Sequence, residues 1–284
     1  NRHWAEFFGR AIVETIEDFG SQGDPPTHPQ LLDWLATDYV KHGWSTKTLH
    51  KRIVMSATYR QSSRVRKDLL ERDLYNVWYA RGPRFRLKAE FIRDNALAIA
   101  GLLSDKMYGP PVFPFQPAGV WNHIGVASNV WKTSIGEDLH RRGLYTYWRR
   151  TVHYPSFANF DAPSREACTV KRSRSNTPLQ ALTLLNDPVY FEAAIALASR
   201  VMTEPSTNAT IHERIEHGFR LATGRRPVAR EIDILVKRYQ SELLRYRGSP
   251  KTAKLVIGTS AVPKGAKAAE FAAWIHVGNI LLNL

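Results

Sequence analysis

Along most of the chain, apolar residues recur at spacings of three and four, the pattern that gathers them on one face of an α-helix. Sustained alternation of apolar and polar residues, which would predict strands, is scarce. In residues 88–103 the spacing places Phe91, Ala98 and Leu102 on the inward face. Residues 139–150 fit either a helix or a short strand. The predicted helices span residues 3–15, 28–43, 46–61, 88–103, 211–222, 229–246 and 268–282, and two more begin after Thr177 and Asp187.

Two helix starts are marked by their local chemistry. In Thr177-Pro178-Leu179-Gln180, the threonine suits the cap position, the proline suits the first helical position, and the glutamine can reach back to the threonine amide. The sequence Asn186-Asp187-Pro188 repeats this logic ten positions later. Each cap is worth on the order of 1 kcal/mol. A helix start also presents free amides, and the first of these follows a run of arginines, so an anion could bind there.

Residues 108–134 differ from the rest of the chain because they are rich in proline, glycine and tryptophan. They are too interrupted for a long helix, and their aromatic content argues against disorder. We expect a long ordered loop or a lid. The predicted fold class is therefore all-α, an irregular multi-helix bundle with a long Pro/Gly/Trp-rich loop.

The whole chain, residues 1–284, is predicted to form a single mostly helical domain. It could divide into sub-bundles of residues 1–105 and 136–284, joined by the loop of residues 106–135. The chain begins without methionine and enters an apolar pattern at once, so we expect it to be a fragment of a longer, multidomain protein. No segment approaches the roughly 20 apolar residues of a membrane span.

The formal net charge of +14 favours anionic partners such as nucleic acid, acidic or sulfated polysaccharide, or an anionic membrane surface. No recognisable nucleic-acid module accompanies the charge, which makes nucleic acid the weaker candidate. A single cysteine, Cys168, excludes an intramolecular disulfide and any multi-cysteine metal site. We predict no cofactor and no metal, since the pairs His212/Glu216 and Glu213/His217 lack a third ligand.

Basic residues are concentrated between residues 141 and 174, interleaved with aromatic ones. Arginine dominates this set, and its planar fork suits carboxylate, sulfate or phosphate. Alternatively, the arginines could pair with Asp138, Asp161 and Glu166 and tie irregular backbone segments together. The cluster comprises Arg141, Arg142, Arg149, Arg150, Arg165, Lys171, Arg172 and Arg174, with Tyr145, Tyr147, Trp148 and Tyr154 among them.

Candidate catalytic groups are sparse. His153, Ser156 and Asp161 lie close in sequence, but no G-x-S-x-G motif accompanies them, and Cys168 is an equally weak nucleophile candidate. Glu90 and Asp94 lie one helical turn apart and could do acid–base work. A solvated or salt-bridged helix face explains that pair equally simply.

Several long motifs resemble a known family. They include RRGLYTYWRRT from Arg141, FDAPSREACTVKRSRSNTPLQALTLLNDP from Phe160, HPQLLDWLA from His28 and LATGRRP from Leu221. The chain is similar to a C-terminal domain of unknown function, of PSD type, found in planctomycete surface proteins that often also carry a cytochrome c domain. The resemblance implies export, a multidomain parent and association with systems that handle complex, often sulfated, polysaccharides. It implies no established reaction, and the haem-binding module of such proteins is absent from this chain.

The leading hypothesis is an extracytoplasmic (periplasmic or cell-surface) helical domain that binds or processes anionic or complex polysaccharide, between the aromatic loop of residues 115–131 and the arginine-rich segment. An alternative is a glycoside or ester hydrolase that uses His153, Asp161, Glu90 and Asp94. A third is a structural module that docks other domains of the parent, a cytochrome c domain among them, and has no ligand. The predicted ligand-binding residues are Arg149, Arg150, Arg165, Arg172, Asn176, Gln180, Trp121 and Trp131.

Overall fold

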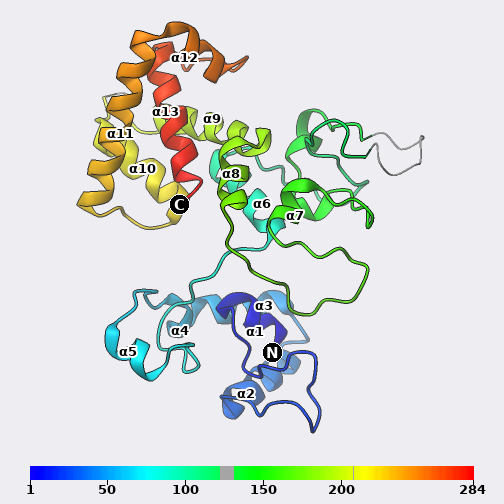
Figure 1. Cartoon of the computed structure of the whole chain (residues 1–284). Helices are drawn as coiled ribbons and strands as arrows, with labels where there is room; N and C mark the ends of the chain where they lie inside the picture. Colours follow the sequence, from blue (N-terminus) through cyan, green and yellow to red (C-terminus); the bar gives the residue numbers. More distant parts are fainter. Residues whose placement is uncertain (122–130, 207) are drawn as a thin grey trace. The chain divides into compact units, whose positions relative to one another are not determined.

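A computed structural model describes residues 1–121, 131–206 and 208–284 (Figure 1). These residues form thirteen α-helices and two 3-10 helices, and within them no strand occurs beyond one isolated parallel bridge between Val112 and Thr146. The prediction of an all-α, multi-helix fold is confirmed. No single helix in the described ranges has the length and apolar content to cross a membrane. Within those ranges, the two consecutive helices α8 and α9 meet these criteria when taken as one segment, and they are bent by 58° relative to each other.

The chain divides into two compact units. The N-terminal unit comprises Asn1–Arg86 with Cys168–Lys171, and the C-terminal unit comprises Leu87–Ala167 with Arg172–Leu284. The boundary at residue 86 precedes the loop of residues 106–135 that the sequence suggested as a joint.

The N-terminal unit contains five short helices around a small aromatic core. Trp4 stacks on Phe8 at 4.1 Å between ring centroids, and the ring of Tyr79 meets the edge of both. Ile12, Leu49 and Ile53 complete this core. The helices are α1 (Arg2–Phe8), α2 (Pro29–Lys41), α3 (Thr46–Met55), α4 (Ala57–Arg60) and α5 (Lys67–Arg72).

Two predicted helices of this unit end early. The first stops at Gly9, whose φ of 71° only glycine adopts freely, and the Asn1 side chain then bonds both the amide and the carbonyl of Val13 at 3.0 Å. The predicted helix of residues 46–61 breaks at Ser56, which takes an extended conformation and accepts a hydrogen bond from the Tyr59 amide. Ser56 therefore caps a new helix instead of continuing the old one.

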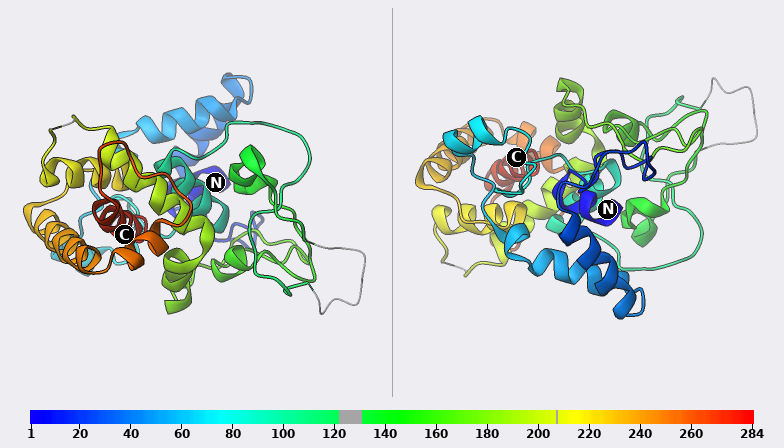
Figure 2. Two further views of the ribbon diagram at one scale, coloured as in Figure 1. Left: turned by 90° about the horizontal axis from the view of Figure 1, so that it is seen from above. Right: turned by 90° about the horizontal axis from the view of Figure 1, so that it is seen from below.

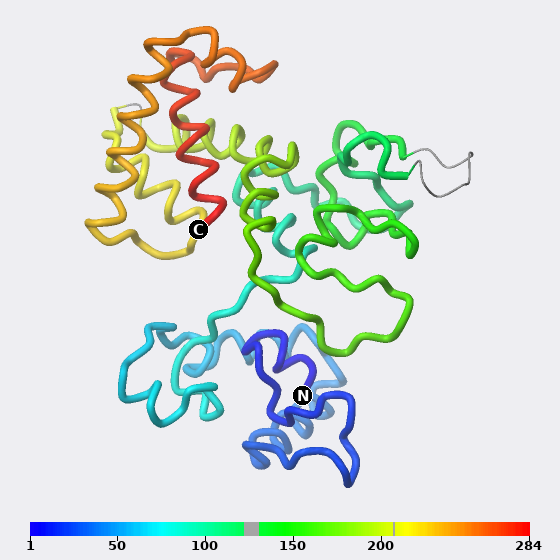
Figure 3. The backbone as a smooth tube through the Cα atoms, viewed as in Figure 1, coloured from blue at the N-terminus to red at the C-terminus, as the bar shows by residue number. Residues whose placement is uncertain are grey.

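The C-terminal unit is built around α13, a helix that is apolar on all sides and consequently buried. Helices α9, α11 and α12 pack around it (Figure 2), and the tube view shows α11 and α13 running alongside each other (Figure 3). Gly278 permits the approach of α9, since a Cβ there would lie 2.8 Å from the Ala194 carbonyl oxygen. The helices are α6 (Ala89–Ala100), η2 (Gly136–His140), η3 (Gly143–Tyr145), α7 (Pro155–Asn159), α8 (Pro178–Asn186), α9 (Pro188–Thr203), α10 (Ile211–Thr223), α11 (Ala229–Gly248), α12 (Pro250–Ile257) and α13 (Ala268–Leu281).

The apolar spacing of residues 88–103 was wrong for two of the three residues that it placed inward, Phe91 and Ala98, whereas Leu102 is partly buried and packs against the core. Phe91 is 55% exposed, and Ala98 is also exposed, whereas Arg93, Ala96 and Ala100 are buried. The reason is that the Arg93 guanidinium donates to two backbone carbonyls of the η2 region, which turns this charged side chain toward the interior. The predicted short helix or strand at residues 139–150 is instead irregular backbone with two short 3-10 turns.

Candidate functional site

The start of α8 holds a polar network that needs no ligand. The Thr177 amide donates to Gln180 Oε1 at 3.4 Å, and Gln180 Nε2 donates to the Asn159 carbonyl at 3.0 Å and to Ser175 Oγ at 3.1 Å. The predicted capping box at Thr177 is confirmed, as is the cap at Asp187, whose carboxylate accepts from the Val189 amide at 2.9 Å. Gln180 is only 4% exposed, so its amide serves the fold locally.

Asp161 belongs to the same network. Its carboxylate accepts from the Ser175 amide at 2.7 Å and from Ser175 Oγ at 2.8 Å. Its backbone lies in the left-handed region, with a φ of 60°. These bonds tie Asp161 to Ser175, and Ser156 bonds the Tyr190 hydroxyl at 3.2 Å. No hydrogen bond among the described residues joins His153, Ser156 and Asp161 into a triad.

Glu90 and Asp94 occupy successive turns of α6 in contrasting environments. Burial raises the pKa of Glu90, but the hydrogen bond from Arg172 at 2.7 Å, a bond from the Glu90 backbone amide and the charges of Arg172 and Arg165 together outweigh it and leave the pKa below its ordinary value. Burial also raises the pKa of Asp94, and there the Gly143 amide, at 2.6 Å, and the nearby arginines only partly offset it, so the pKa stays above its ordinary value. The two carboxyls are therefore displaced in opposite directions.

Several arginines and one lysine of the basic cluster act as internal ties. Arg141 is fully buried, donates to the carbonyls of Tyr108 and Pro110, and lies 3.9 Å from the ring centroid of Tyr145. Lys171 forms an ion pair at 2.8 Å with Glu14, inside the N-terminal unit. In the described ranges, ties of this kind join the cluster to Glu90, to Glu14 and to backbone carbonyls, and Asp138 pairs with Lys106.

The aromatic loop brings Trp121 and Trp131 together edge to face, with ring centroids 5.2 Å apart. Trp131 Nε1 donates to the Pro114 carbonyl at 2.8 Å, which fixes its ring. The guanidinium of Arg149 lies 4.8 Å from the Trp121 ring centroid. Residues 122–130 of the loop, expected to contribute to the site, lie outside the described residues.

A second arginine lies over a second indole. The Arg165 guanidinium is 4.2 Å from the ring centroid of Trp148, whose Nε1 donates to the Ser164 carbonyl at 3.2 Å. The His153 ring stacks on the same indole, with 5.7 Å between the ring centroids. Arg165 is exposed, as are Arg150 and Asn176. Within the described ranges, neither Arg149 nor Arg165 forms an ion pair with a carboxylate.

The structure thus divides the predicted site residues into two groups. Glu90, Asp94, Asp161, Arg172 and Gln180 are engaged with protein partners, whereas the polar groups of Arg149, Arg150, Arg165 and Asn176 face solvent or a ring. Among the residues that the structure describes, no three His, Cys, Asp or Glu side chains gather as metal ligands.

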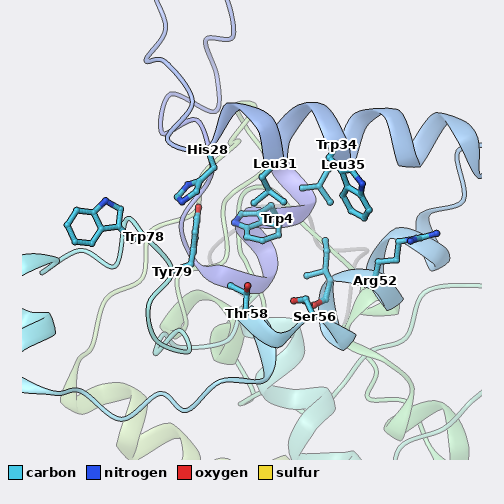
Figure 4. Close-up of a pocket in the computed structure, with 11 residues that line it drawn as sticks. Trp4, His28, Leu31, Trp34, Leu35, Arg52, Ser56, Thr58, Trp78 and Tyr79 are labelled. Carbon is cyan, nitrogen blue, oxygen red and sulfur yellow. The ribbon is translucent and has the colours of Figure 1, made fainter.

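The N-terminal unit contains a pocket that sequence reasoning missed. It has a volume of 340 Å³, and Figure 4 shows Trp34 and Trp78 toward opposite ends of its lining with Trp4 between them. The signal was present in α2, where Leu31, Trp34 and Leu35 share one helix face although the helix has no fully buried residue. The rest of the lining comprises His28, Arg52, Ile53, Ser56, Thr58 and Tyr79.

Comparison with known proteins gives one match. The model of the PSD1 family, described as "Protein of unknown function (DUF1553)", matches residues 1–239. No curated protein and no solved structure matches the chain significantly.

Proposed function

The chain belongs to the PSD1 family of proteins of unknown function, and we propose that it is an extracytoplasmic domain that binds anionic, complex polysaccharide. The observation that carries the proposal is the pair of arginine–indole stacks in the C-terminal unit, Arg149 on Trp121 and Arg165 on Trp148. The resemblance to domains of planctomycete surface proteins supports export. It also makes other domains of the parent, including a cytochrome c domain, the expected protein partners.

Stacking prepares an arginine to bind an anion. A guanidinium held over an indole ring is restrained in position, and those of its N–H groups that point away from the ring can form hydrogen bonds to sulfate or carboxylate. Neither arginine forms an ion pair with a carboxylate in the described ranges, so an anionic ligand would not have to break one, although the charge of Arg165 does help to lower the pKa of Glu90. The formal net charge of +14 adds long-range attraction for a polyanion.

A sulfated or uronate-containing sugar suits these arginines. Its anionic group can bind the guanidinium that lies over each indole, and its hydroxyl groups can bond exposed polar side chains such as Arg150 and Asn176. Nucleic acid could also use aromatic and basic groups, but no nucleic-acid module accompanies them. In this proposal Arg149, Arg150, Arg165 and Asn176 contact the ligand, and Arg172 and Gln180 hold the segment in place.

The test is retention of the chain on sulfated and uronate-containing glycans. We expect Arg149→Ala and Arg165→Ala each to weaken retention about tenfold, a loss of about 1.4 kcal/mol, and added salt to weaken it further. Arg230→Ala is the matched control, since it removes the same charge from an exposed position outside the stacks. Unchanged retention in both variants, with the fold intact, would overturn the proposal. A lowered melting temperature of Arg165→Ala without any ligand effect would favour the structural docking module instead.

A hydrolase is the second candidate, and the opposite pKa displacements of Glu90 and Asp94 are the observation in its favour. A carboxyl with a raised pKa can donate a proton while a neighbour with a lowered pKa accepts one. Activity profiling on glycans and esters, followed by Glu90→Gln and Asp94→Asn, tests this function. His153→Ala and Asp161→Asn belong in the same series. Turnover that survives all four substitutions would eliminate these residues as its source.

A further inference from the structure

We propose that the pocket of the N-terminal unit is a separate binding site for one or two neutral pyranose rings. It is lined by Trp4, Trp34, Trp78 and Tyr79 and lies wholly within that unit (Figure 4). The inference does not depend on the arginine–indole stacks, which belong to the C-terminal unit. The volume of the pocket, 340 Å³, lies near the lower end of the range for small-molecule pockets, about 300–1,000 Å³.

The exposed indoles at this pocket are the first step of the argument. Trp34 is 51% exposed and Trp78 is 61% exposed, although both line a pocket whose floor includes the buried rings of Trp4 and Tyr79. Two large apolar side chains that remain open to water beside a cavity mark a binding surface more than a folding core. Their flat faces favour a flat ligand with an apolar side.

The polar groups of the pocket define the second step. Ser56, Thr58 and His28 place two hydroxyls and an imidazole among the apolar walls, so a ligand with hydroxyl groups can form hydrogen bonds there. Ser56 Oγ already donates to the Ile53 carbonyl, which leaves Thr58 as the freer hydroxyl within the described residues. Ser56 also accepts from the Tyr59 amide and His28 Nδ1 bonds Thr27 Oγ1, so the Thr58 hydroxyl is the group in this lining that a hydroxylated ligand would bond and a purely apolar ligand would not.

The charge of the ligand follows from Arg52. Its Nε forms an ion pair with Asp38 at 2.9 Å, its Nη2 lies 3.0 Å from His42 Nε2, and its guanidinium is 5.8 Å from the Trp34 ring centroid. Since Asp38 already neutralises this arginine, the pocket lacks the uncompensated charge that an anionic ligand would seek. No carboxylate lines the described pocket, which disfavours a cation. A neutral, hydroxylated ring fits best.

The experiment is isothermal titration of the full chain with cellobiose, maltose and lactose as neutral probes. We expect saturable binding of at least one of them, weakened at least about tenfold by Trp34→Ala and by Trp78→Ala. Both residues are exposed, so the fold should survive either change. Thr58→Val should also weaken binding, and Trp34→Phe should restore part of it. Trp44→Ala is the matched control, because it removes an indole of the same unit that is 64% exposed and does not line the pocket.

Three results would overturn the inference: no saturable binding of any neutral probe, binding that Trp34→Ala and Trp78→Ala leave unchanged, or saturation by a leucine-rich peptide in the absence of sugar binding. The two proposals fail separately. Arg149→Ala and Arg165→Ala should leave cellobiose, maltose and lactose binding intact, while Trp34→Ala should leave retention on sulfated glycans intact. Neutral-sugar binding should also persist in salt that releases a polyanion.

Discussion

Arg172 Nη1 donates a hydrogen bond to Glu90 Oε2 at 2.7 Å and thereby ties the arginine-rich segment to the first turn of α6. Both side chains are largely buried, so the pair is shielded from the salt and water that weaken surface ion pairs. Arg172 thus has a carboxylate partner within the fold, whereas Arg165, seven residues before it, lies on an indole. Two arginines of one basic run therefore have different physical roles.

Arg172→Met should destabilise the C-terminal unit by about 1.5–3 kcal/mol at neutral pH, the usual contribution of a hydrogen bond to a charged group. The pKa of Glu90 is lowered in the folded state, because the Arg172 hydrogen bond and charge, with smaller help from the Glu90 amide and Arg165, exceed the opposing effect of burial. Its stabilisation is therefore present above the unfolded-state pKa and is lost as the pH falls through the folded-state pKa. Urea unfolding of both proteins across acid and neutral pH measures this; a gap that stays constant into strong acid would contradict it.

Asp94→Asn should have the opposite pH signature. Burial raises the pKa of Asp94 above its ordinary value of 3.8. The folded protein therefore loses stability as the pH rises from the unfolded-state pKa of this group through its folded-state pKa. Asparagine keeps an oxygen that can accept from the Gly143 amide but carries no charge to desolvate. We therefore expect Asp94→Asn to match or exceed the parent in free energy of unfolding at neutral pH. If Asp94→Asn instead had a much lower free energy of unfolding than the parent at neutral pH, and an equal one in acid, the charge of Asp94 would be stabilising.

Local chemistry explains which parts of the fold the sequence predicted. The starts of α8 and α9 are encoded by Thr177 and Asp187 with the prolines that follow them. At the first, the Gln180 side chain accepts from the Thr177 amide, and at the second the Asp187 carboxylate accepts from the Val189 amide. Helix α13 is apolar on all faces, so its own sequence indicates that it is buried. Such features need only neighbours in sequence, so they can be predicted without knowing the tertiary structure.

Features that depend on distant residues were not predictable in this way. Arg93 faces inward because carbonyls more than forty residues away in sequence accept its hydrogen bonds, at 2.6 Å each, and apolar spacing cannot mark such a position. The pocket of the N-terminal unit draws on α1, α2, α3, α4 and residues 78–79, and no local pattern joins these segments. The sequence identified the arginines as a group but could not show which of them were already paired.

Arg93→Met should cost about 2–5 kcal/mol in the free energy of unfolding. The Arg93 side chain is 1% exposed, and its removal would leave the carbonyls of Leu139 and Arg141 without these donors in the interior. Arg150→Met is the matched control, because that arginine is exposed and should change stability by less than about 0.5 kcal/mol. Chemical denaturation of the two variants makes the comparison. Equal, small effects would show that solvent or neighbouring donors replace Arg93 easily.

Gln180→Leu and Arg165→Ala should have opposite effects on stability and ligand retention. Gln180→Leu should lower the free energy of unfolding alone, and Arg165→Ala should lower retention on sulfated glycan alone. Gln180 bonds Asn159, Ser175 and Thr177, so leucine would remove three internal hydrogen bonds and lower the free energy of unfolding by about 1–3 kcal/mol. Retention of the folded protein on sulfated glycan should not change. Arg165 is exposed and bonded to no carboxylate within the described ranges, so alanine should leave unfolding nearly unaltered and reduce retention.

The crossed design matters because both residues lie in the single stretch from Asp161 to Pro188 and the sequence gives them the same role. Each variant is the control for the other, since a general loss of folded protein would lower both readouts together. If Gln180→Leu abolished retention at full stability, the amide would have to contact the ligand, and the capping network would have to open to release it. If Arg165→Ala destabilised the fold as much as Gln180→Leu, its stack on Trp148 would be a packing contact, and the polysaccharide proposal would rest on Arg149 alone.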